Sequence, residues 1–255
     1  MRHPILSNER FKYVAAGEGE ALILLHGLFG SLANFDQTVS HFSLSYKTFA
    51  PLLPLYDLPI ASSTVDGMVA YLLDFVNEMN LGTVTLVGNS LGGHVALVFA
   101  LKYPERINAL VLTGSSGLFE KGFGEALPKR GDYQYIRHKT EQTFYNPAIA
   151  TKELVDEVFD IVSDREKALK VLSMAKSALR NNLADQLCHI KVPVLLIWGK
   201  NDNITPPEVA KEFHKLLSNS ELVWIDHCGH AAMMEQPQLF NELLEGFLRS
   251  LKQTA

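Results

Sequence analysis

The sequence has few cysteines, no long apolar run and no strong excess of charge. Its only two cysteines, Cys188 and Cys228, are too few for a disulfide framework or a cysteine-based metal cluster. We therefore expect two buried free thiols and a cytoplasmic protein. No apolar run comes near the roughly 18 residues of a membrane helix. The N-terminal stretch also lacks the apolar core of a signal peptide, so we expect no membrane span.

The charge balance gives no reason to expect a polyanionic partner. The formal net charge is −5 and the sequence pI is near 6.0, which disfavours binding to nucleic acid or to an anionic membrane surface. Hydrophobic residues make up 47% of the 255 residues, an ordinary share for a globular protein. The length fits one large domain, or one domain that carries an insertion.

Strand-like and helix-like segments alternate over the first part of the chain. Two runs, at residues 21–25 and 107–112, are apolar at successive positions, as is typical of buried parallel strands. Alternation of this kind predicts an α/β fold, with a parallel sheet and helices on both faces. Further strands are expected at 11–16, 46–50 and 83–87, and helices at 35–42, 64–79 and 93–100.

The pattern changes between residues 118 and 183. Strand signals vanish there, and helical segments follow at 151–162, with Thr151 as the N-cap, and at 164–179. Strand-like runs resume at 192–198 and 221–225. We therefore expect a core formed by residues 1–117 and 184–255, and a helical cap inserted over the sheet at 118–183.

A serine flanked by glycines lies where a strand-like run meets a helical run, in Gly88-Asn89-Ser90-Leu91-Gly92. A strand that passes into a helix within so few residues crowds the backbone, and glycines remove the side chains that would clash. The corner would expose the hydroxyl and aim the first amides of the helix at the group attacked. This context favours a nucleophile over a chance match in a loop.

A serine hydroxyl needs a base, which is usually a histidine oriented by a carboxylate. Among nine histidines, His230 directly follows the last predicted strand, at the sheet edge that carries Ser90. His227 stays open as an alternative. His94 and His214 lie on predicted helices, and we expect both to be structural.

Asp202 follows the preceding predicted strand and is the candidate acid. A turn or helix-capping role is the plain alternative for this residue. The other suitable place, residues 113–117 after an earlier strand, holds no carboxylate. The chain order Ser90, Asp202, His230 is also that of one large fold class. We therefore expect Asp202 to orient His230.

An oxyanion hole requires amides that point at the developing negative charge. One would come from Leu91, directly after the serine. The other would come from the glycine-containing loop at residues 26–31, where we expect the Leu28 amide to donate. Phe29 is a neighbour that would donate instead or line the pocket, and His26 is expected to brace the loop.

These motifs together resemble the α/β-hydrolase fold enzymes. His26-Gly27-Leu28-Phe29-Gly30, Gly88-Asn89-Ser90-Leu91-Gly92-Gly93, Asp202 and Gly229-His230 agree with that family in order and spacing. The resemblance covers nearly the whole chain apart from the insertion, which matches the family's cap in position. It implies a mostly parallel sheet of about eight strands with helices on both faces.

Within this family the serine argues against haloalkane dehalogenases and epoxide hydrolases, which use aspartate at that position. The loop at 26–31 is similar to that of small esterases, which act on esters or thioesters. The Gly88-Asn89-Ser90 corner, residues 114–118 and residues 144–154 instead resemble the meta-cleavage product hydrolases. Those enzymes cleave a carbon–carbon bond in a ring-opened aromatic acid.

The second resemblance departs at two places. By our alignment, Val158 stands where those hydrolases have a cap arginine that grips the substrate carboxylate, and Ala231-Ala232 stands where they tend to have tryptophan. We therefore expect Ser90 to cleave a small, largely apolar ester or thioester through an acyl-enzyme. Carbon–carbon hydrolysis of a dienoate stays the alternative. The arginines left open as substitutes are Arg130, Arg137 and Arg180.

The remaining expectations concern ligands. The candidate substrate-contacting residues are Phe29, Asn89, Phe144 and Met233. No metal or organic cofactor is expected. The expected partners are an ester-type small molecule and water, and the protein is expected to be a monomer or a homodimer. A non-catalytic small-molecule receptor on the same fold is a further alternative.

Overall fold

A computed structural model of the chain describes residues 3–119 and 131–254. Its strands form one sheet in the order β1-β2-β4-β3-β5-β6-β7-β8, in which β2 pairs antiparallel with β1 and β4 and the other neighbours are parallel. The predicted α/β fold class is confirmed. The strands are β1 Leu6–Ser7, β2 Lys12–Ala16, β3 Ala21–Leu25, β4 Lys47–Pro51, β5 Val84–Asn89, β6 Ile107–Thr113, β7 Val194–Gly199 and β8 Ser220–Ile225.

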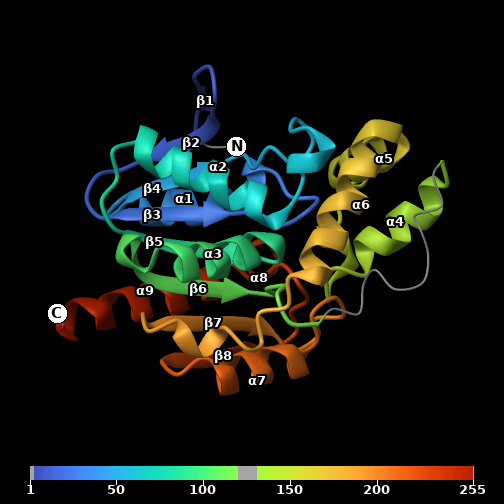
Figure 1. Cartoon of the computed structure of the whole chain (residues 1–255). Helices are drawn as coiled ribbons and strands as arrows, with labels where there is room; N and C mark the ends of the chain where they lie inside the picture. Colours follow the sequence, from blue (N-terminus) through green and yellow to red (C-terminus); the bar gives the residue numbers. More distant parts are fainter. Residues whose placement is uncertain (1–2, 120–130, 255) are drawn as a thin grey trace.

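Helices cover both faces of the sheet (Figure 1) because successive strand side chains point to opposite faces. In β3, Ile23 and Leu25 belong to one buried cluster, and Leu22 and Leu24 belong to the other. Helices α2 Val65–Glu78, α3 Leu91–Lys102 and α7 Pro207–Leu216 contribute to the first cluster. Helices α1 Asp36–Phe42, α8 Ala232–Glu235 and α9 Pro237–Thr254 contribute to the second.

Three helices between β6 and β7 lie beyond the carboxyl ends of the parallel strands (Figure 1). All three have side-chain N-caps: Asp132 accepts from the amide of Tyr135, Thr151 from that of Leu154, and Asp164 from those of Glu166 and Lys167. These helices are α4 Tyr133–Glu141, α5 Lys152–Ser163 and α6 Arg165–Arg180. Short 3-10 turns occur at Leu32–Phe35, Ile60–Ser62, Pro104–Arg106, Pro147–Ile149 and Leu187–His189.

The corner between β5 and α3 is closely packed backbone. Ser90 occupies it with φ 54° and ψ −119°, in the left-handed half of the conformational map that non-glycine residues rarely adopt. A Cβ on Gly92 would lie 2.1 Å from the Leu25 carbonyl oxygen, and one on Gly88 would lie 2.5 Å from the Gly92 oxygen. Only glycine fits at these two positions, so they allow β3, β5 and α3 to meet around Ser90.

Two buried histidines hold loops at this edge of the sheet. The Leu53 amide donates to Nε2 of His26 over 3.0 Å, so Nδ1 carries the proton and donates to the Gly27 carbonyl over 2.8 Å. On α3, Nδ1 of His94 lies 3.4 Å from the Ser116 hydroxyl. Burial lowers the pKa of each histidine from 6.5 to about 4, so both are neutral near pH 7.

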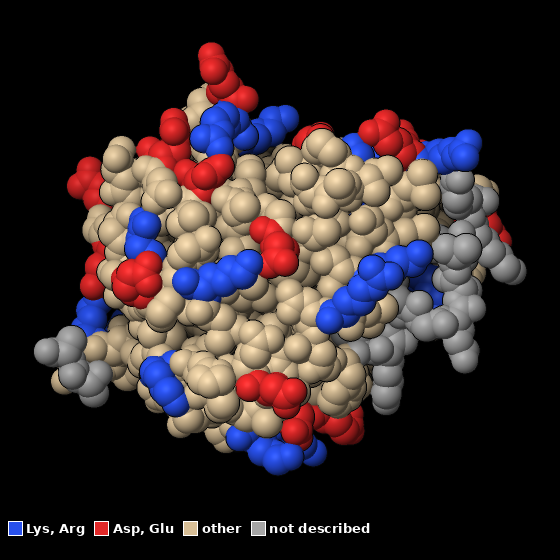
Figure 2. Space-filling model, viewed as in Figure 1, with Lys and Arg blue, Asp and Glu red and all other residues tan. Residues whose placement is uncertain are grey.

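The surface carries charges of both signs. On the face drawn in Figure 2, basic and acidic side chains are interspersed. Across residues 3–119 and 131–254, no helix is long and apolar enough to cross a membrane. Both cysteines are free, but only Cys228 is buried. The prediction for Cys188 is wrong: the 3-10 turn that carries it buries Leu187 and turns Cys188 to solvent.

We expect Gly92→Ala to destabilise the protein by about 3 kcal/mol, because the new methyl group meets main chain that cannot move away. Gly246→Ala is the matched control. Gly246 is exposed on α9 with open space around it, and alanine there should stabilise the helix by about 0.5–1 kcal/mol. Urea unfolding of the two variants measures both effects. Equal stability of the two variants would contradict this account of the corner.

The free energy of unfolding should fall as the pH drops from 6.5 to about 4. Over this range His26 and His94 take up protons in the unfolded chain, whereas in the folded protein they stay neutral. Each neutral histidine makes its full contribution to stability above the pKa that it has in the unfolded chain. As the pH falls to about 4 this contribution is lost, which amounts to about 3 kcal/mol for each histidine. Urea unfolding across this range should show a shallower fall for His94→Leu than for the wild type. Exposed His214→Gln is the control, and an unchanged slope in His94→Leu would count against the assignment.

Candidate active site

Ser90 is half-buried at the end of β5, and its main chain is held on two sides. Its amide donates to the Thr113 carbonyl over 3.1 Å, at the end of the neighbouring strand β6. Its carbonyl accepts from the amides of Ser116 and His94, each over 3.2 Å. These bonds fix the corner from the sheet and from the helix, so the direction of the Ser90 side chain is set by the fold.

His230 and Asp202 form a buried pair at the carboxyl ends of the last two strands. Nδ1 of His230 lies 2.9 Å from Oδ2 of Asp202, and the side chains are 8% and 0% exposed. An ionised carboxylate can only accept, so the imidazole carries its proton on Nδ1 and leaves Nε2 as an acceptor. This is the tautomer that a general base for a hydroxyl requires. The alternative base, His227, is exposed, and its ring lies against Tyr145.

The Asp202 carboxylate accepts further hydrogen bonds from its own loop. Oδ1 accepts from the amides of Ile204 and Thr205 over 2.8 and 2.9 Å, and Oδ2 accepts from the Thr205 hydroxyl over 2.8 Å. The Trp198 indole in turn donates to the Thr205 carbonyl over 2.8 Å. Several donors are needed to keep a buried carboxylate charged. Thr205 was not among the residues that the sequence singled out.

The His230 loop lies against the Ser90 corner. The side-chain amide of Asn89 donates to the carbonyls of Thr113 and His230, each over 3.0 Å. A Cβ on Gly114 would lie 2.8 Å from Nδ1 of His230. The residue next to Ser90 therefore bonds directly to the main chain of His230, and the end of β6 lies against both residues. Asn89 uses its amide donors on main chain, so it braces the histidine loop.

Glu235 joins the histidine loop to the segment that follows α4. Its carboxylate accepts from the amides of Gly229, Tyr145 and Asn146 over 2.7, 3.2 and 2.5 Å. The His230 amide also donates to the Thr143 carbonyl over 2.8 Å. The loop that positions His230 is thus fixed partly by the helical segment between β6 and β7. Glu235, too, was not singled out from the sequence.

The loop after β3 forms a tight turn beside Ser90. The Gly30 amide donates to the Gly27 carbonyl over 3.0 Å, and His26 donates to the same oxygen. A peptide N–H points opposite to its C=O, so these bonds aim the Leu28 amide away from His26. A Cβ on Gly27 would lie 3.1 Å from Cβ of Ser90, so the turn contacts the corner directly.

The Leu91 amide directly follows the serine in the chain. Leu91 begins α3, and the first hydrogen bond of that helix runs from His94 to Ser90. The Leu91 N–H therefore precedes the helical ladder, in the partly positive first turn. The amides of Leu28 and Leu91 are therefore the candidate donors of an oxyanion hole.

The other candidate substrate residues are mostly buried. Phe144 and Met233 are 6% and 1% exposed and belong to one apolar cluster, whereas Phe29 is half-buried against the other. Met233 belongs to the short helix α8, directly after the His230 loop. These side chains contribute apolar packing next to the site.

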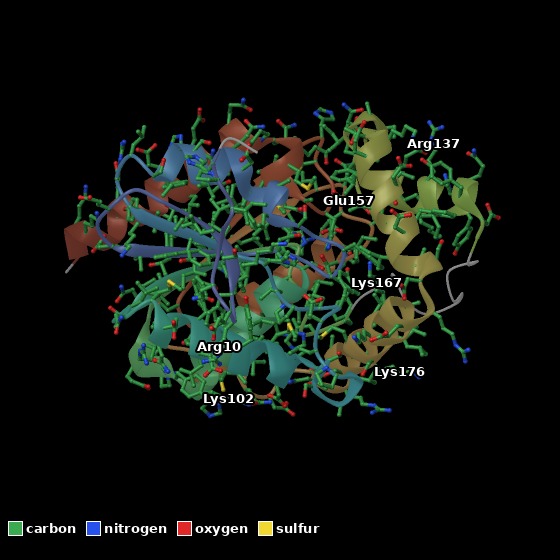
Figure 3. All side chains as sticks on the ribbon, turned by 90° about the horizontal axis from the view of Figure 1, so that it is seen from above. Arg10, Lys102, Arg137, Glu157, Lys167 and Lys176 are labelled. Carbon is green, nitrogen blue, oxygen red and sulfur yellow. The ribbon has the colours of Figure 1, made fainter. Side chains whose placement is uncertain are left out.

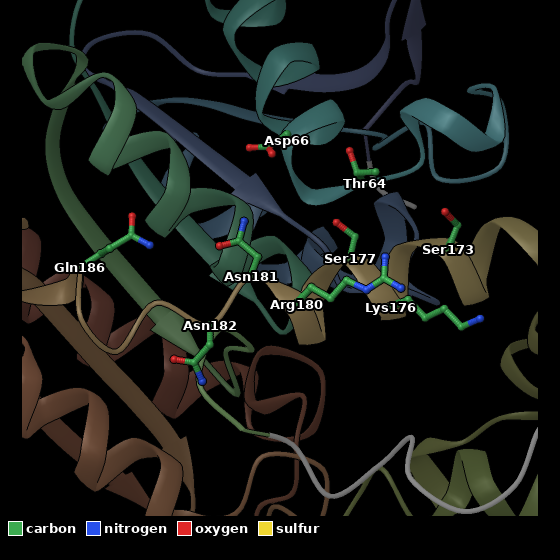
Figure 4. A pocket seen from close by; sticks show the side chains of 9 residues that line it. All are labelled: Thr64, Asp66, Ser173, Lys176, Ser177, Arg180, Asn181, Asn182 and Gln186. Carbon is green, nitrogen blue, oxygen red and sulfur yellow. The ribbon is translucent and has the colours of Figure 1, made fainter.

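The arginines considered as partners for a substrate carboxylate lie away from the Ser90 corner and the His230 loop. Arg137 pairs with Glu141 over 2.7 Å on α4, at the outer side of the helices in Figure 3. Arg180 lines a hollow of about 420 Å³ between the start of α2 and the end of α6 (Figure 4), together with Thr64, Asp66, Ser173, Lys176, Ser177, Asn181, Asn182 and Gln186. Arg130 lies outside the described residues.

The described ranges hold no group of three or more His, Cys, Asp or Glu side chains that could bind a metal ion.

Comparison with known proteins gives relatives along almost the whole chain. A hydrolase of Burkholderia vietnamiensis that acts on 2-hydroxy-6-oxononadienedioate and 2-hydroxy-6-oxononatrienedioate is 30% identical, over 94% of this chain and 91% of the relative. The 2-hydroxy-6-oxo-6-phenylhexa-2,4-dienoate hydrolase of Comamonas testosteroni is 27% identical, over 96% of this chain and 93% of the relative.

A solved structure is similar at the level of the fold and the sequence. It is MGS-MChE2, described as an alpha/beta hydrolase enzyme from the metagenome of sediments from the lagoon of Mar Chica, Morocco. It is 42% identical, with a TM-score of 0.81, and the alignment covers 97% of this chain and 98% of that one. The model of the alpha/beta hydrolase family matches residues 22–243. The chain therefore belongs to the alpha/beta hydrolase family and is a hydrolase.

Proposed function

We propose that this hydrolase cleaves a carbon–carbon bond in a ring-opened 2-hydroxy-6-oxo-dienoate, with Ser90 as nucleophile, His230 as base and Asp202 as its orienting acid. The buried His230–Asp202 pair, 2.9 Å apart beside the Ser90 corner, is the observation that carries the reaction type. The substrate class is supported by the two curated relatives, each a hydrolase of such a compound.

The proposed mechanism uses each group where the fold places it. His230 takes the proton of Ser90 on Nε2, and the serine oxygen adds to the ketone carbonyl of the substrate. The Leu28 and Leu91 amides receive the oxyanion. The 2-hydroxyl proton of the dienoate shifts to the carbon next to the ketone, so that this carbon can leave as part of a dienolate. Collapse of the adduct then expels the dienolate, whose oxygen takes the proton held by His230, and leaves an acyl-serine. Water activated by His230 then releases the acid.

Hydrolysis of a small apolar ester is the second candidate function. The same acyl-serine forms when the leaving group is an alcohol instead of a carbon acid. Val158 on α5 favours the ester, because it offers no charge at the position where our alignment expects an arginine. Arg137 is paired on α4, and Arg180 lines the hollow away from the triad. A dianionic dienoate gains most from a bidentate arginine, which neither residue supplies in this arrangement.

We also propose that residues 118–183 act as a cap that shapes the substrate pocket. In support, α4, α5 and α6 lie beyond the strand ends (Figure 1), and Thr143 bonds to His230. The monomeric or dimeric state and the cytoplasmic location stay predictions.

Ser90→Ala should lower the turnover of every substrate by at least about 10³-fold, because the nucleophile is lost, while the protein stays folded. The measurement compares kcat/KM for one ring-opened dienoate with that for p-nitrophenyl butyrate. The main proposal expects the dienoate value to be the higher, by about tenfold or more for wild type. A higher value for the ester would favour the second candidate.

Labelling with a fluorophosphonate tests the alternative of a non-catalytic receptor. Labelling of the wild type that is absent in Ser90→Ala excludes such a receptor, and a wild type that is not labelled would support one.

Asp202→Asn should lower kcat by about 10³- to 10⁴-fold, because an amide neither fixes the Nδ1–H tautomer nor stabilises the imidazolium. Asp226→Asn is the matched control. That carboxylate pairs with Lys200 at the surface, and its side chain is 68% exposed. Steady-state kinetics of both variants on the better substrate give the comparison. Similar kcat values for the two variants would refute the assignment of Asp202.

A further inference from the structure

The turn after β3 is a β-turn, a structure that can adopt two types differing in the direction of one peptide. Gly27 and Gly30 close a β-turn whose central residues are Leu28 and Phe29. Neither central residue has a positive φ, so the turn belongs to type I and not to type II. The two types differ by a reversal of the central peptide, which contains the Leu28 carbonyl and the Phe29 amide. The groups that hold this peptide therefore decide where the turn presents its donors.

The Tyr56 side chain holds the central peptide. Its hydroxyl donates to the Leu28 carbonyl over 2.7 Å. His26 fixes the preceding peptide through the Gly27 carbonyl, so the two side chains together fix both peptides next to Leu28. Burial, together with the nearby Glu157, raises the pKa of Tyr56 well above its ordinary value, so the hydroxyl keeps its proton.

Tyr56 is held in turn by a buried lysine on α6. Nζ of Lys170 donates to the Tyr56 carbonyl over 2.8 Å and pairs with the Glu166 carboxylate over 2.7 Å. The Lys170 side chain is 8% exposed, whereas that of Glu166 is 73% exposed. A lysine is rarely buried to this extent unless its charge has specific partners. Here one of those partners is the main chain of Tyr56.

We propose that Tyr56 is a positioning residue of the oxyanion hole, and that Lys170 acts on the hole through Tyr56. The chain of bonds runs from α6 through Lys170 and Tyr56 to Leu28. It links α6 to the peptide between Leu28 and Phe29, which adjoins the peptide that carries the Leu28 amide. This inference rests on the proposed function, because it assigns the Leu28 turn to the stabilisation of the oxyanion.

Tyr56→Phe removes only the hydroxyl and should lower kcat by about 10- to 100-fold, with KM within about twofold. A trifluoromethyl ketone, whose adduct with Ser90 carries an oxyanion, should lose affinity by the same factor as kcat. Tyr71→Phe is the matched control. The Tyr71 hydroxyl also donates to a main-chain carbonyl of the loop after β4, that of Leu52 over 3.0 Å, but it does not contact the turn. Its kcat should stay within about twofold of wild type.

Lys170→Met should also lower kcat, as Tyr56→Phe does. Because Lys170 acts through Tyr56, the double variant should lose little beyond Tyr56→Phe alone. Full multiplication of the two losses would contradict the proposed path. Equal kcat values for Tyr56→Phe and Tyr71→Phe would overturn the role of Tyr56.

Hydrogen exchange separates this inference from the proposed function. Amides in residues 26–31 should exchange faster in Tyr56→Phe than in wild type or Tyr71→Phe, whatever substrate the protein uses. If wild type turns over neither a dienoate nor an ester, the proposed function fails, and exchange at the turn still decides whether Tyr56 holds it. Unchanged exchange in Tyr56→Phe would overturn the inference.

Discussion

The backbone constraint at Ser90 is the feature on which the rest of the site depends. A residue with φ 54° at the junction of β5 and α3 is stable only if neighbouring segments hold it there. Thr113 does so from β6 and Ser116 from the loop that follows. Gly92 allows the turn of the chain because its missing side chain leaves room for the Leu25 carbonyl. The direction of the Ser90 side chain, the proposed nucleophile, therefore depends on three strands and a helix.

The other parts of the site lie on loops, each of which is held by hydrogen bonds from particular side chains. Asp202 is fixed by Thr205, and the His230 loop is fixed by Asn89 and Glu235. Leu28 sits in a turn held by His26 from its own loop and by Tyr56 from a later segment. Such networks hold reacting groups in place before the substrate arrives, which is how an enzyme avoids reorganisation during the reaction.

The sequence alone was sufficient for features that depend on local pattern. Apolar periodicity placed β2 to β8 and the helices α1, α2, α3, α5 and α6 within two residues of their bounds, whereas β1, α8 and α9 were not predicted. Helix α4 was missed because its surface is mostly polar, with only Ile136 and Thr140 buried. Glu235 and Tyr56 were also missed, because each acts through a hydrogen bond to a residue that only the folded chain brings near. Thr205 was missed although it is close to Asp202 in the sequence, because its role depends on the conformation of their loop. Tyr56 and Lys170 are far apart in the sequence, so no periodic pattern of residues predicts their contact.

The central claim is that Ser90 carries an acyl group during turnover, whichever bond is cleaved. Acid quenching of a reaction in progress, followed by peptide mapping by mass spectrometry, tests this claim most directly. We expect an added acyl mass on the peptide that contains Ser90 while substrate is being turned over. Once the substrate is exhausted, the same peptide should be unmodified. Substrate turnover with no adduct on that peptide, or with the adduct on another residue, would contradict it.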